Sequence, residues 1–167
     1  MTILYISGAL LLLVFLIFLI IGLSMPKEHK ISRNVFIKAP LDDVWNTVTN
    51  VVRQIEWRTD LQKIELKDSV DDYLIWTEIP KEGNSVTQQM LALQEHKLFE
   101  KEIIPTSMYV GHSLIEFSSS QAGTTLRITE SLGVDNPLKR PLAKISKKLE
   151  AGANQYQEDL KKYLEVA

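Results

Sequence analysis

The apolar segment near the amino terminus constrains this chain more than any other feature. The segment Ile3–Leu23, ILYISGALLLLVFLIFLIIGL, carries no charged side chain. As an α-helix rising about 1.5 Å per residue, it would extend about 31 Å, which matches the hydrocarbon core of a bilayer. The lipid bilayer is therefore an expected partner, and we predict that residues 1–25 form a transmembrane anchor.

The residues that flank this segment favour an uncleaved anchor over a cleaved signal peptide. No basic residue precedes the segment, and the bulky Ile21 and Leu23 occupy the end where a signal peptide has small residues. Basic side chains follow it closely, at Lys27, Lys30, Arg33 and Lys38. The positive-inside rule then predicts a single-pass membrane protein whose remaining residues lie in the cytoplasm.

Residues 26–167 have the length of one domain and a nearly balanced charge. All 19 Lys and Arg residues and all 21 Asp and Glu residues lie in this part, so no basic excess indicates a nucleic-acid binder. The chain has no cysteine, and its histidines, His29, His96 and His112, lack the spacing of a zinc site. We expect no metal, no cofactor and no nucleic-acid partner.

Hydrophobic periodicity predicts a strand, a helix and then six further strands. Alternating apolar residues indicate a strand over Lys30–Lys38, and apolar residues at helical spacing indicate a helix over Leu41–Gln54. The segment Ile55–Leu61 is expected to be an irregular turn or a short helix. Strand-like segments separated by turn residues follow at Ile64–Lys67, Tyr73–Ile79, Val86–Gln94, Lys97–Ile104, His112–Ser119 and Thr124–Leu132.

After Asn136-Pro137 the pattern changes to that of a long amphipathic helix. Apolar residues recur at steps of three, four or seven as far as Leu164. Because Pro141 lies near the beginning of this helix, its start is predicted only to within several residues. A helix of this length is suited to cover one face of an antiparallel sheet, which predicts an α+β fold.

Four stretches of the domain carry a resemblance to a known superfamily. They are APLDDVWNTVTN at residues 39–50, IEWRTDL at 55–61, LIWTEIP at 74–80 and GTTLRITESLGVDNPLKR at 123–140. These stretches resemble the START-like, or SRPBCC, superfamily, which includes polyketide cyclase/dehydrase-like proteins. The resemblance extends over nearly all of residues 26–167. It implies a helix-grip fold, in which the sheet wraps around the long C-terminal helix and leaves a cavity between them.

Strand parity places two carboxylates on faces that are otherwise apolar. Glu78 shares its side of the strand with Trp76, and Glu130 shares its side with Ile128. A buried carboxylate is unfavourable without a partner, so Arg33 or Arg58 is expected to serve as counter-ion. The two carboxylates are interpreted as a polar anchor for a ligand, as an acid/base pair or as members of structural ion pairs.

Three further residues complete the set of cavity candidates. Trp57 and Arg58 lie where the first helix gives way to the sheet, which is a suitable rim for a cavity. Tryptophan there would close over an apolar ligand and arginine would hold an acidic group, although a core tryptophan and a solvated arginine explain them equally well. The predicted ligand-binding residues are Trp57, Arg58, Trp76, Glu78, Ile128 and Glu130.

Basic residues gather at the beginning of the C-terminal helix, at Lys139, Arg140, Lys144, Lys147 and Lys148. If this end faces the bilayer, each charge would contribute about 1 kcal/mol of attraction to anionic lipid. The alternative is an ordinary solvated helix face, balanced by the acidic residues that follow.

The leading functional hypothesis is a membrane-tethered domain that binds a hydrophobic small molecule or lipid in an internal cavity. Families with the implied fold bind apolar small molecules, and some are enzymes or bind protein partners. A cyclase- or dehydratase-like enzyme that uses Glu78, Glu130 or Arg58 is therefore one alternative. A regulatory module that binds a protein partner is another. Whether the chain is an enzyme remains open at this stage.

Overall fold

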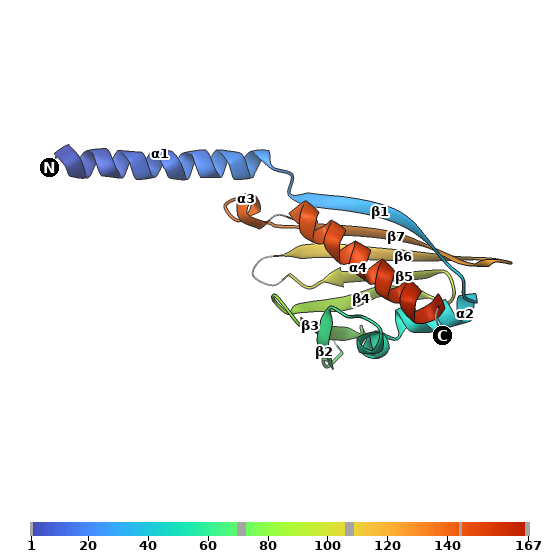
Figure 1. Ribbon diagram of the computed structural model, residues 1–167. Coiled ribbons are helices and arrows are strands. Elements are labelled where there is room, and N and C mark those ends of the chain that lie inside the picture. The colour runs from blue at the N-terminus through green and yellow to red at the C-terminus, as the bar shows by residue number, and fades with distance from the viewer. Residues whose placement is uncertain (1, 70–72, 106–108, 144, 166–167) are drawn as a thin grey trace.

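The computed structural model describes residues 2–69, 73–105, 109–143 and 145–165. Helix α1, Thr2–Ser24, projects away from all other elements (Figure 1). Its apolar side chains from Tyr5 onward are almost all exposed. Among the described helices, α1 is the only one that is long and apolar enough to cross a membrane.

The centre of the domain is an antiparallel sheet of seven described strands in the order β1-β7-β6-β5-β4-β3-β2. Five consecutive hairpin pairings join β2 to β7, and β1 closes the series by pairing with β7. The strands are β1 Glu28–Ile37, β2 Leu61–Leu66, β3 Ile75–Pro80, β4 Val86–Gln94, β5 Leu98–Ile103, β6 Val110–Ser120 and β7 Gly123–Gly133.

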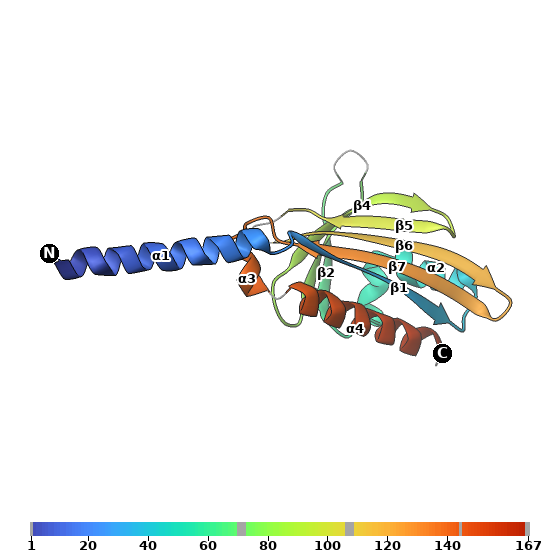
Figure 2. The same cartoon turned by 90° about the horizontal axis from the view of Figure 1, so that it is seen from above.

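Helices connect and cover the sheet. Helix α2, Leu41–Thr49, and the 3-10 helix η1, Val51–Glu56, lie between β1 and β2. After β7 come α3, Arg140–Ala143, and α4, Ile145–Glu165, which together correspond to the predicted C-terminal helix, with residue 144 outside the described residues. Figures 1 and 2 show α4 lying across one face of the sheet.

The predicted helix over Leu41–Gln54 is too long, because the α-helix ends at Thr49. The side chain of Asn50 accepts a hydrogen bond from the backbone of Arg53, which begins η1 instead. The side chain of Gln54 then donates to the carbonyl oxygen of Val48 at 2.8 Å, so the buried glutamine satisfies a carbonyl at the helix end.

The hydrophobic core lies between the sheet, α2 and α4. Alternate residues of the strands and the predicted apolar stripe of α2 are buried in it, among them Val35, Phe99, Leu126, Trp45 and Val48. Leu160 of α4 is fully buried against them. This arrangement is the α+β helix-grip fold that the sequence predicted.

A buried carboxylate holds the second half of α4 to the segment before β2. Asp159 accepts hydrogen bonds from the backbone nitrogen of Thr59 at 2.7 Å and from its hydroxyl at 2.9 Å. Only 5% of Asp159 is exposed. The pair therefore fixes how α4 lies over the sheet.

The end of α1 is joined to the domain through α3. The guanidinium of Arg140 donates to the carbonyl oxygens of Gly22 and Met25 at 3.2 and 3.4 Å, and to that of Val134 at 3.0 Å. These contacts suit the free carbonyls and negative dipole end of a helix terminus. Gly22 is required there, since a Cβ at this position would collide with the carbonyl oxygen of Pro137.

Candidate functional site

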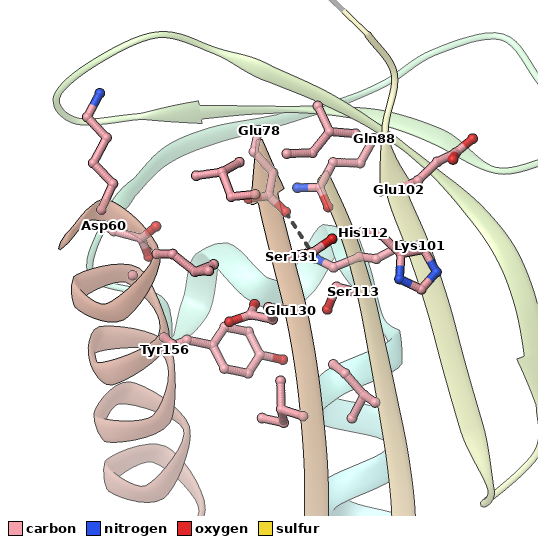
Figure 3. A pocket seen from close by; sticks show the side chains of 18 of the residues that line it. Asp60, Glu78, Gln88, Lys101, Glu102, His112, Ser113, Glu130, Ser131 and Tyr156 are labelled. Carbon is pink, nitrogen blue, oxygen red and sulfur yellow. Dashed lines mark ion pairs between the residues drawn. The ribbon is translucent and has the colours of Figure 1, made fainter. Parts of the chain in front are cut away.

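A cavity of about 220 Å³ lies between the sheet and α4 (Figure 3). Its walls come from β3 to β7 and from the first half of α4. The most exposed lining residues, Lys148 and Gly152, lie on α4 and mark the opening. The lining reaches Leu132 near the end of β7, which is the end of the sheet that α1 joins (Figures 1 and 2).

A buried ion pair forms one side of the cavity. Arg58, just before β2, places Nη1 2.8 Å from Oε2 of Glu78 and Nη2 2.7 Å from Oδ2 of Asp60. The other carboxylate oxygen of Glu78 accepts a hydrogen bond from Nε1 of Trp76 at 3.2 Å. The Arg58 guanidinium is thus shared between two carboxylates, and its pKa rises because their attraction exceeds the effect of burial.

Lys101 of β5 is a second buried cation in the lining. Its Nζ lies 3.8 Å from Oε1 of Glu78 and 5.7 Å from the centre of the Trp76 ring. Burial lowers the pKa of Lys101, and Glu78 opposes this only in part. Burial alone would raise the pKa of Glu78, but Lys101 and Arg58 together hold it below the ordinary value.

Glu130 of β7 has a different environment from Glu78. Burial raises the pKa of Glu130, and the more distant charges of Lys101, Arg58 and Arg33 only partly offset the effect. Among the residues that the structure describes, no side chain or backbone group forms a hydrogen bond or ion pair with its carboxyl group. One cavity thus contains two carboxyl groups whose pKa values are shifted in opposite directions, that of Glu78 downward and that of Glu130 upward.

Four of the six predicted site residues line the cavity: Arg58, Glu78, Ile128 and Glu130. Trp57 and Trp76 do not belong to its lining. Trp57 is buried in the core and packs edge-on against Tyr156, with ring centres 5.1 Å apart. Trp76 is fully buried beside Glu78.

Of the two predicted counter-ions, the structure pairs Arg58 with Glu78. Arg33 donates instead to the side chain of Asn154 on α4. Both tryptophans lie in the core, because their large and mostly apolar rings are usually buried.

The sequence reasoning did not single out Lys101, Ser113 or Tyr156, which also line the cavity. Strand parity contained a signal for Lys101, because it shares one side of β5 with the buried Phe99. A lysine between two glutamates is, however, typical of a solvated strand. Tyr156 follows the helical spacing of the apolar residues in α4, and its hydroxyl adds no periodic signal of its own.

Within the described ranges, no group of three or more His, Asp or Glu side chains is arranged to hold a metal ion. His112 at the cavity rim is paired with Glu100, with Nε2 2.7 Å from Oε1. His96, in the β4–β5 turn, lies 3.3 Å from Asp42 on α2. The cavity lining itself supplies acidic, basic and hydroxyl groups.

Comparison with protein families identifies the domain. The model of the family "Polyketide cyclase / dehydrase and lipid transport" matches residues 28–165. The chain belongs to this family. The match confirms the resemblance noted in the sequence and spans every element from β1 to α4. No curated protein sequence matches the chain.

Solved structures share the fold of this family member at low sequence identity. The di-domain ARO/CYC StfQ from the steffimycin biosynthetic pathway matches with a TM-score of 0.68 and 10% identity over 83% of this chain. The match covers 51% of StfQ, so this chain spans about half the length of that protein.

Two single-domain structures match over almost their whole length. The ZhuI aromatase/cyclase from Streptomyces sp. R1128 has a TM-score of 0.64 and 15% identity, and the match covers 81% of this chain and 94% of that one. A START superfamily protein from Mycobacterium smegmatis has a TM-score of 0.67 and 13% identity. That match covers 82% of this chain and 97% of the other. At these identities the comparisons establish the fold.

Proposed function

We propose that the domain binds a small, largely hydrophobic molecule with one polar group, and that α1 tethers it to a membrane. The observation that carries this proposal is the cavity beneath α4, whose lining combines aliphatic and buried charged side chains. Cross-strand pairing builds that lining in rows. An apolar row containing Ile115 and Ile128 lies on one side of a polar row, and one containing Ile103 and Leu132 lies on the other.

The volume of the cavity restricts the size of the ligand. Its 220 Å³ exceed the roughly 150 Å³ of an engineered apolar cavity that takes up benzene, and are below the roughly 300–1,000 Å³ of drug-sized sites. A small molecule would be enclosed completely. A longer lipid would place one end inside and leave its remaining chain in the opening.

The proposed tether gives the cavity a position relative to the bilayer. Residues 1–25 would form the anchor and residues 26–167 the ligand-binding domain. The basic residues after α1 predict that this domain lies in the cytoplasm. The cavity reaches the end of the sheet that α1 joins, so the opening would lie close to the surface where hydrophobic molecules accumulate.

Gly152 provides a test that leaves the core intact. This glycine lies at the opening, and a Cβ at its position would meet no atom within 4 Å. A tryptophan there would fill the opening without displacing a packed group. Ala151 is the matched control, since it is exposed on the same helix and does not line the cavity.

The experiment compares the full chain, Gly152→Trp and Ala151→Trp in lipid nanodiscs. Bound molecules are extracted and identified by mass spectrometry, with empty nanodiscs as background. The proposal expects a defined small molecule with the full chain and Ala151→Trp, and at least a tenfold smaller amount with Gly152→Trp. Equal amounts in all three samples, or none above background, would contradict it.

A second candidate function is acid–base catalysis in the same cavity. The observation in its favour is the opposite direction of the pKa shifts at Lys101 and Glu130, since groups with displaced pKa values are suited to proton transfer near neutral pH. If the bound molecule is converted over time, Glu130→Gln would stop the conversion. A protein-binding module, in contrast, would be expected to fill its cavity with its own side chains.

A further inference from the structure

We propose that Lys101, Ser113, Glu130 and Tyr156 form a binding site for the carboxylate of a small amphiphilic acid. This inference rests on the proposed function and names the class of ligand for the same cavity. The pairing of three neighbouring strands brings three of these side chains together. Lys101 of β5 pairs with Ser113 of β6, and Ser113 pairs with Glu130 of β7.

Directly paired residues of adjacent strands point to the same face of a sheet. Lys101, Ser113 and Glu130 therefore form one polar row across the wall of the cavity. Tyr156 reaches the same space from α4, on the opposite side (Figure 3). Four polar groups from both layers of the fold thus surround a single small volume.

The polar groups of this row are poorly satisfied by the protein. Only 9% of Ser113 is exposed, and its buried Oγ has no hydrogen-bond partner among the described residues. Within the residues that the structure describes, neither the Tyr156 hydroxyl nor the Glu130 carboxyl forms a hydrogen bond. The nearest carboxylate oxygen to Lys101 Nζ is 3.8 Å away, which leaves the ammonium donors without a close acceptor.

A buried polar group without a partner is unfavourable by about 1–3 kcal/mol, so the buried Ser113 hydroxyl, beside further polar groups of the cavity wall, indicates a polar ligand. The hydrogen-bond donors in the site decide which class of polar ligand it suits. Burial raises the pKa of Tyr156 and keeps its phenol protonated, and burial also raises the pKa of Glu130. With the Ser113 hydroxyl and the Lys101 ammonium, the Tyr156 phenol gives the site three donors to an acceptor, beside Glu130.

The charge of the site favours a single negative charge. Arg58 is already held by Glu78 and Asp60, so its guanidinium is engaged. Lys101 is the remaining cation of the buried cluster, which matches one carboxylate better than a doubly charged phosphate. The apolar rows on either side of the polar row then accommodate a short aliphatic chain.

The test uses octanoate labelled with ¹³C at its carboxyl carbon, and 1-octanol as a probe with the same chain and no charge. The full chain is prepared in nanodiscs, and empty nanodiscs report the partition of each probe into lipid. Affinities are measured by calorimetry. The ¹³C resonance of the carboxyl group reports directly whether the bound carboxylate is in the protein site.

The variants are Lys101→Met, Ser113→Ala and Ser119→Ala. Ser119 is the matched control, because it is an exposed serine on the same side of the same strand, outside the cavity. Lys101→Met keeps the aliphatic volume and leaves Glu78 paired with Arg58. Loss of a charged or hydroxyl donor to a carboxylate is expected to weaken octanoate binding about tenfold or more.

The inference expects octanoate to bind at least tenfold more tightly than 1-octanol, with a shifted ¹³C resonance. Lys101→Met and Ser113→Ala should remove this preference, while Ser119→Ala and the binding of 1-octanol stay unchanged. Equal binding of both probes, or unchanged octanoate binding in the two site variants, would overturn the inference and leave the proposed function standing. Binding of neither probe would also overturn it, and the co-purification experiment would then decide the proposed function alone.

Discussion

Glu78 is the residue on which the buried charges of the cavity depend. It is the common partner of Arg58 and Lys101, and 9% of its side chain is exposed. Removing one partner of a buried pair leaves an uncompensated charge. Loss of Glu78 would therefore leave Lys101, and one side of the Arg58 guanidinium, without their buried carboxylate.

Glu78→Gln is expected to lower the free energy of unfolding by about 3–5 kcal/mol, because Arg58 and Lys101 lose their buried carboxylate. Urea unfolding of the full chain in nanodiscs, followed by tryptophan fluorescence, measures the change. Glu82→Gln is the control, since this carboxylate is exposed in the β3–β4 turn and should alter stability by less than about 0.5 kcal/mol. Similar stabilities of the two variants would show that the pair is dispensable.

Glu130 predicts a pH dependence of the opposite sign to that of an ordinary paired carboxylate. Its pKa in the folded chain is raised above 4.5, the ordinary value that it has in the unfolded chain. At a pH between the unfolded and the folded pKa, the folded chain binds a proton that the unfolded chain has released. Stability due to Glu130 then falls as the pH rises through that interval. Glu130→Gln should be stabilising relative to the natural chain, and more so at pH 8 than at pH 4.5. Urea midpoints at a series of pH values test this, and parallel curves would refute it.

At this scale the sequence identified only part of the site. Glu78 and Glu130 were found because strand parity placed each carboxylate beside apolar neighbours. The same parity does not say which carboxylate has a cation within reach, since Arg58 lies 20 positions before Glu78 in the chain. Ser113 was not predicted, because a serine in a strand has no distinctive sequence pattern. Only the pairing of β5, β6 and β7 places it between Lys101 and Glu130.

At the scale of elements, most strands and both halves of the helical pattern were predictable from periodicity alone. The boundaries that differed depend on individual side chains. The helix expected to reach Gln54 ends at Thr49 because Asn50 and Gln54 bond to backbone groups near the helix end. Such local hydrogen bonds compete with helical ones and leave no trace in hydrophobic spacing.

The docking of α4 provides a prediction at the same scale. Asp159→Ala removes the acceptor for the backbone nitrogen and the hydroxyl of Thr59, and with it a partly buried link between α4 and the segment before β2. We expect a loss of about 1–3 kcal/mol and faster hydrogen exchange along α4. Glu158→Ala, at an exposed position beside it, should leave exchange unchanged. Equal exchange in both variants would contradict the docking role of Asp159.

For the whole molecule, the junction between α1 and α3 determines how the domain is held. Arg140 connects the last carbonyls of α1 to the segment after β7, and Gly22 permits the close approach of Pro137. Hydrophobic patterning predicted the apolar helix and the domain separately. It did not predict their contact, because one arginine that donates to four backbone carbonyls has no periodic signature.

Arg140→Ala is expected to loosen the orientation of the domain relative to α1. The chain has no cysteine, so cysteines introduced at Leu16 and Ser85 will carry the only spin labels. Pulsed electron spin resonance in nanodiscs should give a narrow distance distribution for the natural junction and a broad one for Arg140→Ala. Lys147→Ala on the exposed face of α4 should keep the narrow distribution. A narrow distribution in Arg140→Ala would show that the junction does not depend on this side chain.

The place of the opening, at the end of the sheet joined to α1, has a consequence for binding kinetics. With α1 in the bilayer, a partitioned ligand would meet the domain by diffusing sideways within a thin layer, where its local concentration far exceeds that in water. High effective concentration allows a site of modest intrinsic affinity to be well occupied. Modest affinity in turn permits rapid release, so the cavity would exchange its contents with the membrane rather than store them.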